Sequence, residues 1–270
     1  MQRSLILLFR LFPLWLMYGL MALVIPFYAL LDGRARKASY RFARRLGYGR
    51  LRSALHVLSN MFNMGTLVMD RFGAYAGKRF KLVSDTMPLY DRLSEQEGGF
   101  MLLSSHLGHF EMAGYMFHSR KTTYALVFGG ETATVMQNRS RMFGMANVRM
   151  VPVSDDLSHI FTLSGALADG QIVSIPADRG LGSPKQLRCP FLGQDAAFPA
   201  GPFTLAVQRE VPVLAVFVMK ESIHTYRVIL EELPAAGSRE SLAEAYSAAL
   251  ERMARRYPAQ WYNFYDFWAA

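Results

Sequence analysis

The clearest pattern along this chain is an alternation, from residue 99 onward, of short apolar runs with longer segments of helical periodicity. The apolar runs predict strands at 100–105, 123–128, 148–153, 172–177, 211–220 and 224–231. The remaining segments predict helices at 109–119, 132–145, 155–169, 200–209 and 238–257. Because strands and helices take turns, we predict an α/β fold with a mixed, largely parallel sheet flanked by helices.

The N-terminal part of the chain has a different pattern. Residues 11–31 form a run of 21 uncharged positions, which is long enough to cross the hydrocarbon core of a membrane. Residues 35–75 are expected to be rich in helix. Pro13 and Pro26 interrupt the apolar run, so a helix that lies in the membrane interface is an alternative to a transmembrane helix. A buried core helix of a soluble protein is a third interpretation.

Basic residues are concentrated beside this apolar run. The whole chain has a net charge of +9 at pH 7, and residues 1–52 alone carry ten basic side chains and one acidic one. A basic band next to apolar residues favours anionic lipid headgroups, and no nucleic-acid-binding motif follows it. Most of the band follows the apolar run, which places the rest of the chain in the cytoplasm. We therefore expect an N-terminal membrane anchor or interfacial helix, residues 1–34, and a second domain, residues 35–270.

The first candidate for chemistry lies where the predicted strand 100–105 ends. His106 follows that strand, and Glu111 stands where the next helix is expected to begin. On one continuous helix, residues five apart point roughly 140° away from each other. The two side chains therefore meet only if His106 is on the loop and Glu111 in the first helical turn. That arrangement is typical of a general base and its orienting carboxylate, although most single histidines are surface or core residues.

A second polar pair follows another predicted strand. Asp178 and Arg179 come directly after the run 172–177, and ligands bind at the carboxyl ends of strands in such sheets. The pair is one of five short sequence blocks. The His106-to-Glu111 block precedes it, and FLG at 191–193, FPAGPFTLA at 198–206 and YPAQWYNFYDFW at 257–268 follow it. With these blocks the chain resembles the lysophospholipid acyltransferase superfamily, and within it the bacterial lipid A biosynthesis (lauroyl/myristoyl) acyltransferase branch.

The resemblance implies a glycerolipid acyltransferase-like fold and a membrane-associated O-acyltransferase. Such an enzyme moves a fatty acyl group from acyl carrier protein, or from acyl-CoA, to a hydroxyl of a glycolipid. It works at the inner membrane with its catalytic domain in the cytoplasm, and it needs no cofactor. Carried over to this chain, His106 deprotonates the acceptor hydroxyl, and Glu111 holds the imidazole tautomer. No covalent acyl-enzyme is needed, which agrees with the absence of a G-x-S-x-G motif.

Four residues are expected to bind substrate. Arg179, beside Asp178, is placed to stabilise an oxyanion or to grip a phosphate, and an ordinary turn contact between the two residues is the alternative. Arg139 and Arg141 are candidates for a headgroup phosphate, and a solvated helix face explains them equally well. We expect no metal site, because the spacing around His109 lacks the HExxH order.

The acceptor and two other functions stay open at this stage. Phe198-Pro199-Ala200-Gly201-Pro202 lacks the glutamate of the phosphatidic-acid-forming enzymes, which argues against a glycerol phosphate acceptor. The aromatic C-terminus looks more like acyltransferases of bacterial pigment-lipid or aminolipid pathways, so the acceptor is a lipid A-type or another bacterial lipid. The alternatives to acyl transfer are a hydrolase of acyl thioesters or lipids and a non-catalytic membrane-binding protein.

Overall fold

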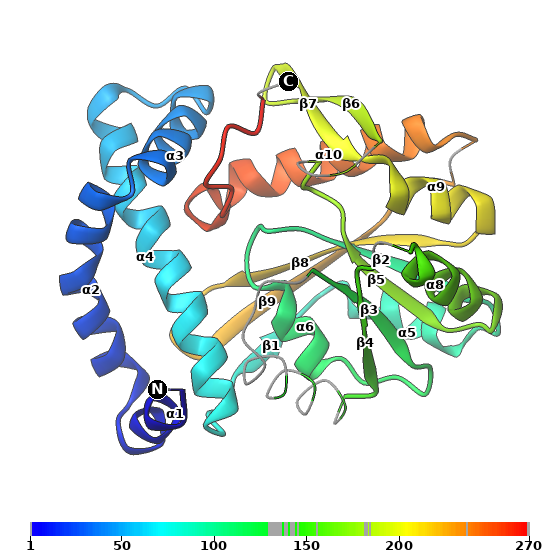
Figure 1. Cartoon of the computed structure of the whole chain (residues 1–270), viewed down its shortest axis with the longest axis horizontal. Helices are drawn as coiled ribbons and strands as arrows, with labels where there is room; N and C mark the ends of the chain where they lie inside the picture. The colour runs from blue at the N-terminus through cyan, green and yellow to red at the C-terminus, as the bar shows by residue number, and fades with distance from the viewer. Residues whose placement is uncertain are drawn as a thin grey trace.

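A central seven-stranded sheet dominates the computed structural model, which describes residues 2–128, 137, 140, 144, 146–154, 156–180, 183, 185–235 and 237–268 (Figure 1). The strands are β1 (Lys81–Val83), β2 (Phe100–Ser104), β3 (Thr123–Val127), β4 (Val148–Pro152), β5 (Ile172–Pro176), β8 (Val213–Lys220) and β9 (Thr225–Glu232). Their order across the sheet is β1-β9-β8-β2-β5-β3-β4. Only the β8–β9 pair among these is antiparallel, so the sheet is mixed and largely parallel, as predicted.

The helices and a small hairpin surround this sheet. The helices are α1 (Gln2–Leu11), α2 (Leu14–Leu31), α3 (Gly33–Arg45), α4 (Arg50–Tyr75), α5 (Met87–Glu95), α6 (Phe110–Met116), α8 (Ser158–Ala168), α9 (Ala200–Arg209) and α10 (Arg239–Arg256). The hairpin pairs β6 (Gln186–Phe191) with β7 (Gln194–Pro199), and a short 3₁₀ turn, Pro258–Gln260, precedes the C-terminal segment. The six predicted strands are confirmed to within two residues at each end. The short β1, helix α5 and the hairpin were not predicted, and the helix expected at 132–145 lies largely outside the described residues.

Alternating side chains of the strands pack into two hydrophobic cores, one on each face of the sheet. In β2, Met101 and Leu103 belong to a cluster that includes residues of α8, α9 and α10. Phe100 and Leu102, which alternate with them, belong to a second cluster with residues of α4, α5 and α6. Successive side chains of a strand point to opposite faces, so this central strand is apolar throughout because both faces are covered.

The parallel pairing of β2 with β5 decides where the candidate residues emerge. Leu103 lies opposite Ile175, and Ser104 lies opposite Pro176, which ends β5. Parallel neighbours finish at the same edge of a sheet. The two segments that follow, with His106 and Asp178, therefore leave the sheet side by side.

Helix α2 packs along α4 instead of standing apart from the domain (Figure 1). Its inward face is buried at Leu14, Met17, Tyr18, Met21, Ile25 and Ala29, which recur every three or four residues. The two helices approach closely at Gly65, where a Cβ atom would lie 2.1 Å from Sδ of Met21. Among the described residues, Leu14–Leu31 is also the one helix long and apolar enough to cross a membrane by length and composition.

The two prolines of the apolar run behave differently. Pro13 separates α1 from α2, as expected, whereas Pro26 lies inside a continuous α2. Pro26 removes one backbone hydrogen bond, but the buried neighbours Ile25 and Ala29 hold the helix against the rest of the domain. The expectation that Pro26 interrupts the helix is therefore wrong. The division of the chain at residue 34 stays a prediction, and α3 runs through that point.

Candidate functional site

The loop that carries His106 is held on both sides by backbone hydrogen bonds. The carbonyl of His106 accepts from the Tyr262 amide at 2.9 Å, and the Gly108 amide donates to the Gln260 carbonyl at 2.8 Å. Gly108 adopts a left-handed conformation with φ +72°, and a Cβ atom there would lie 2.2 Å from the carbonyl oxygen of Val218. A glycine is therefore required for the loop to pass this close to β8.

The side chain of His106 is bonded to Asp178. Nδ1 of the imidazole lies 2.8 Å from Oδ1 of Asp178, and the backbone amide of His106 donates to Oδ2 at 2.9 Å. Both carboxylate oxygens thus accept from the same residue. The Asp178 side chain is completely buried, whereas the His106 side chain keeps 23% of its surface exposed. An ionised carboxylate at Nδ1 places the imidazole proton there and leaves the lone pair of Nε2 to accept another proton.

The environment of Asp178 keeps its carboxylate charged. Burial alone would raise the pKa of Asp178, but the charge and hydrogen bonds of His106, with a contribution from Arg179, outweigh it and lower that pKa. Hydrogen bonds to the charged form are the usual reason why a buried carboxylate stays ionised. Asp178 is therefore an acceptor at neutral pH, as the orientation of the imidazole requires.

Glu111 occupies the predicted place, and an arginine is one of its partners. It lies in the first turn of α6, as the sequence indicated, and its carboxylate pairs with Arg71 of α4 at 3.0 Å. The imidazole itself pairs with Asp178, a contact that the sequence did not predict. The reason is topological: adjacent parallel strands bring Asp178 to the imidazole from 72 positions away, while the helix turns Glu111 toward α4.

Arg179 holds the C-terminal segment through two hydrogen bonds. Its Nε donates to Oδ1 of Asn263 at 3.1 Å, and its Nη2 donates to the carbonyl of Tyr262 at 3.0 Å. Because the Tyr262 amide also bonds to the His106 carbonyl, Arg179 stabilises the same loop from outside. Its role in gripping a phosphate stays a prediction.

The other two arginines named as substrate-binding candidates cannot be placed in the site. Arg139 and Arg141 lie outside the described residues. Their expected contact with a headgroup phosphate therefore stays a prediction.

An apolar pocket lies beside the histidine. It has a cavity volume of about 60 Å³ and is partly open to solvent, between α6 and the strands β2, β3 and β5. Phe110, whose ring is 5.7 Å from that of His106, forms one part of its wall, and Phe117 forms another. The polar lining includes Ser104 and Glu111. The Ser104 hydroxyl is buried without a hydrogen-bond partner among the described residues, so it is available to a bound molecule.

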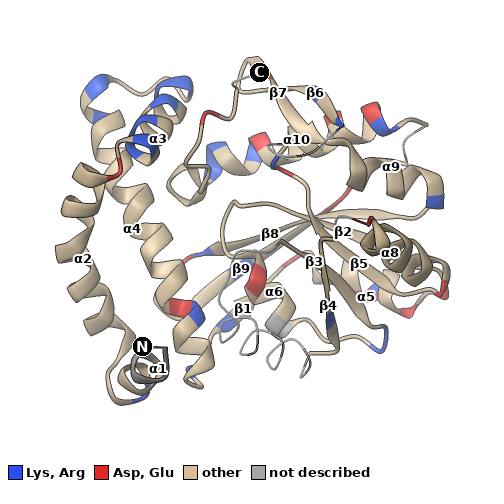
Figure 2. Ribbon diagram, in the orientation of Figure 1, with Lys and Arg blue, Asp and Glu red and all other residues tan. Residues whose placement is uncertain are grey.

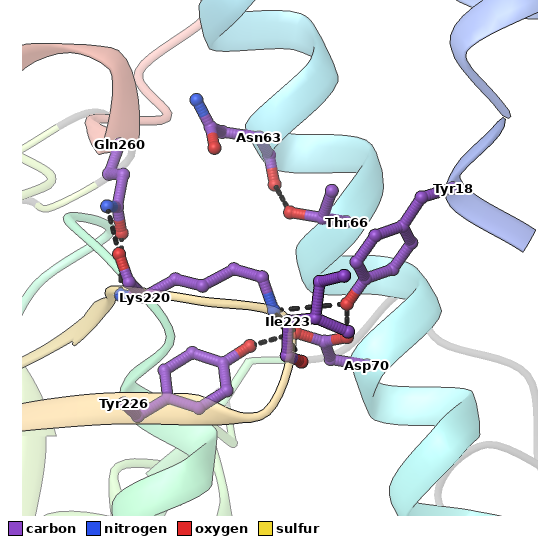
Figure 3. A network of polar contacts seen from close by, with 8 residues as sticks. All are labelled: Tyr18, Asn63, Thr66, Asp70, Lys220, Ile223, Tyr226 and Gln260. Atoms are coloured by element: carbon purple, nitrogen blue, oxygen red, sulfur yellow. Dashed lines mark hydrogen bonds and ion pairs between the residues drawn. The ribbon is translucent and has the colours of Figure 1, made fainter. Parts of the chain in front are cut away.

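A second buried carboxylate, which the sequence did not point to, lies on α4. Asp70 accepts hydrogen bonds from Tyr18 of α2, Lys220 of β8 and Tyr226 of β9 (Figure 3). Burial raises the pKa of Asp70, and Lys220 offsets that only in part. The backbone of Lys220 is in turn paired with the side chain of Gln260 at 2.9 and 2.8 Å. This network, the Asp70 cluster, connects the apolar helix with the sheet and with the segment that holds the His106 loop.

One weak signal in the sequence could have identified this cluster. Asp70 is the single acidic residue of the 26-residue segment Arg50–Tyr75. A lone carboxylate on a largely apolar helix needs a partner if it is buried, but nothing in the sequence indicates which one.

The described residues contain no group of three or more histidine, cysteine, aspartate or glutamate side chains placed to hold a metal ion. His109 is buried, with its ring packed 5.8 Å from that of Tyr226. Cys189 is also buried, and burial raises the pKa of its thiol to about 12, so it packs as a small apolar side chain.

Comparison with known protein families gives a match over most of the chain. The family described as bacterial lipid A biosynthesis acyltransferase matches residues 82–269, which is well over half of the chain. The matched region begins in β1 and includes His106, Glu111 and Asp178. No curated protein matches the chain.

Proposed function

Because this chain belongs to the bacterial lipid A biosynthesis acyltransferase family, we propose that it moves a fatty acyl group from acyl carrier protein to a hydroxyl of a glycolipid or related membrane lipid. Membership of the family supports acyltransferase activity on a lipid. The acyl donor, the catalytic base and the kind of acceptor lipid are our proposal. The observation that carries it is the pairing of a partly exposed imidazole, His106, with the fully buried carboxylate of Asp178.

In the proposed reaction, His106 is the general base. Nε2 takes the proton of the acceptor hydroxyl while that oxygen attacks the carbonyl carbon of the acyl thioester. The tetrahedral intermediate then breaks its C–S bond, and the departing thiolate takes the proton back from the imidazolium. Asp178 keeps Nδ1 protonated throughout and stabilises the transient positive charge on the ring. An ester forms, a thioester is broken, and no covalent acyl-enzyme is required.

The pocket beside the histidine supports the binding of an acyl chain. Its lining is mainly apolar, and its wall begins at Phe110, in contact with the His106 ring. In this proposal the acyl thioester lies between this pocket and His106, and the pocket widens to take the whole chain, because its volume of about 60 Å³ has room for only a few water molecules. In this proposal Asp178 takes the orienting role that the sequence assigned to Glu111. Glu111, which lines the pocket, pairs with Arg71 of α4.

The N-terminal helices support attachment to the membrane. The outer face of α2 exposes large apolar side chains, which are Trp15, Leu20, Leu23, Val24, Phe27, Tyr28, Leu30 and Leu31. Basic residues of α3 follow directly, and α2 itself carries no charge (Figure 2). We infer that α2 enters the lipid with this face while its inner face stays on α4. The location would be the inner membrane, with the catalytic domain on the cytoplasmic side, where acyl carrier protein is found.

The test follows an acyl label through membranes that contain the protein. Wild type, His106→Ala and His118→Ala are incubated with radiolabelled acyl carrier protein, over several acyl lengths, and total lipid of the source cells. His118 is exposed and serves as the matched control. We expect label in one lipid with wild type and His118→Ala, and at least about 100-fold less with His106→Ala.

Each other result contradicts the proposal in a different way. Label released as free fatty acid, dependent on His106, would identify a hydrolase. Transfer that His106→Ala leaves unchanged would remove the proposed base. No transfer from any donor, together with unchanged lipid binding, would leave a non-catalytic membrane-binding protein.

A further inference from the structure

A second cavity lies far along the chain from the catalytic residues, between α2, α3 and α4. It has a volume of about 610 Å³ and is open to solvent. Its lining includes Ala29 and Leu30 of α2, Lys37 of α3, and Ala54 and Leu58 of α4. It shares no lining residue with the pocket beside His106. We call it the three-helix groove.

The walls of the three-helix groove are apolar and continue into the exposed face of α2. Leu30 and Leu58 line the groove and are also exposed at its edge. Beside them Phe27 and Leu31 of α2 and Leu55 of α4 expose further apolar surface. A contiguous exposed patch of this kind marks a surface that contacts lipid or another apolar partner.

One side of the same groove is cationic. Arg36 and Lys37 line it and are exposed. Nη1 of Arg36 donates to the carbonyls of Ala29 and Leu30 at 2.8 and 3.0 Å, which fixes the guanidinium over the last turn of α2. The remaining N–H groups of Arg36 have no hydrogen-bond partner in the described part of the chain. Between residues 14 and 58 there are eight basic side chains and one acidic one, so the potential here is positive (Figure 2).

We propose that the three-helix groove binds one anionic phospholipid of the membrane. Its acyl chains would cover the walls formed by α2 and α4, and its phosphate would lie between Arg36 and Lys37. A free phosphate would leave the apolar walls bare, and a neutral lipid would leave the cations without a counter-charge. The inference rests on the proposed membrane attachment but not on the catalytic mechanism. The bound lipid would stabilise the contact of α2 with α3 and α4.

Native mass spectrometry of the detergent-purified protein tests this site, with phosphatidylglycerol and phosphatidylcholine as probes. Ala54→Trp fills the groove without a change of charge, and Lys37→Gln removes one cation. Arg50→Gln removes an exposed cation of α4 that does not line the groove, and it is the matched control. We expect one retained phosphatidylglycerol in wild type and Arg50→Gln. Retention should fall about ten-fold in Lys37→Gln, because one charge-assisted hydrogen bond is worth at least that factor. It should fall at least as far in Ala54→Trp, because the indole occupies the space that the acyl chains would fill.

Flotation of the same proteins with vesicles separates this inference from the membrane attachment on which it rests. Wild type that floats with vesicles but retains both lipids equally, or groove variants that retain phosphatidylglycerol like wild type, would overturn the lipid site alone. Wild type that floats with no vesicle would overturn both. Unchanged melting temperatures of Lys37→Gln and Arg50→Gln without added lipid would show that the loss is one of binding and not of folding.

Discussion

In the described part of the chain, two carboxylates are completely buried, and they are used in opposite ways. Asp178 gives both of its oxygens to one residue, His106, whose ring is still partly exposed. Asp70 is enclosed by three donors, Tyr18, Lys220 and Tyr226, from three different elements. Their pKa values are shifted in opposite directions, down for Asp178 and up for Asp70.

The difference lies in what remains accessible after the carboxylate has been paired. The partner of Asp178 has a second ring nitrogen, so in the proposed mechanism the pairing prepares that nitrogen to accept a proton from a substrate. The partners of Asp70 donate their hydrogen bonds within the Asp70 cluster. The pairing therefore joins α2 and α4 to the sheet. We therefore assign chemistry to the first carboxylate and structural linkage to the second.

The largest effect is expected for Asp178→Asn. The His106 amide needs an acceptor, so the new side-chain oxygen stays with it and the new NH₂ group faces Nδ1. Nδ1 must then accept, the proton moves to Nε2, and the base is lost. Acyl transfer should slow roughly a thousand-fold or more, measured as initial rates on membranes. Circular dichroism of the variant should match wild type; a normal rate in a folded Asp178→Asn would refute the assignment.

Asp70→Asn should have the reverse profile. It leaves the ammonium of Lys220, with 14% of its side chain exposed, without its counter-charge. The free energy of unfolding should fall by about 3 kcal/mol, while the transfer rate per folded molecule changes less than ten-fold. Adding Lys220→Met should restore most of that stability in denaturant titrations. If the single variant instead lost transfer at unchanged stability, the two carboxylates would not differ as described.

His56 sharpens the comparison, because it is a buried imidazole without a carboxylate. Its Nε2 has no hydrogen-bond partner among the described residues, and its ring packs 5.7 Å from that of Phe42. Burial, with a smaller effect of Arg52, lowers the pKa of His56 from 6.5 to about 4. Between these values the unfolded chain binds a proton that the folded chain does not, so stability falls as the pH drops through that window.

The loss of stability at acid pH that is due to His56 can be measured by comparing wild type with His56→Phe. Wild type should lose up to about 3 kcal/mol between pH 6.5 and 4 through this residue, and the variant should lack that part of the loss. Thermal melts at several pH values measure it. Parallel pH curves for the two proteins would show that His56 does not titrate as its burial implies.

The smallest effect is expected for Glu111→Gln. The amide keeps the shape of the side chain and loses the charge paired with Arg71, while the bond between His106 and Asp178 stays intact. Transfer should slow by no more than about ten-fold, since the pair is partly exposed at Arg71. A loss as large as that of Asp178→Asn would return the orienting role to Glu111, where the sequence had placed it.

The sequence predicted the sheet well because its strands are apolar and its helices periodic. It also placed His106 and Asp178 at strand ends, but strand order is not visible in a single sequence, so the contact between them was not predicted. Glu111 was chosen as partner because it is near in the chain. Short β1 and the hairpin of β6 and β7 lack a long periodic signal and were missed for that reason.

The Asp70 cluster shows a different limit of the sequence. Tyr18, Asp70 and Lys220 lie in α2, α4 and β8, and each by itself looks like an ordinary residue of its element. Composition indicated that α2 is apolar enough for a membrane, but not that one face is docked on α4. Small residues such as Gly65 allow α2 and α4 to pack closely. Their role becomes clear only once the two helices are known to be neighbours.

The most direct test of the account is the protonation of the His106 ring, observed by nitrogen-15 NMR of protein labelled at histidine and assigned with His106→Ala. At a pH where the ring is neutral, we predict a protonated Nδ1 and an unprotonated Nε2 in wild type, and the opposite tautomer in Asp178→Asn. A wild-type ring protonated at Nε2, or a tautomer that Asp178→Asn leaves unchanged, would contradict the claim that Asp178 prepares His106 as the base.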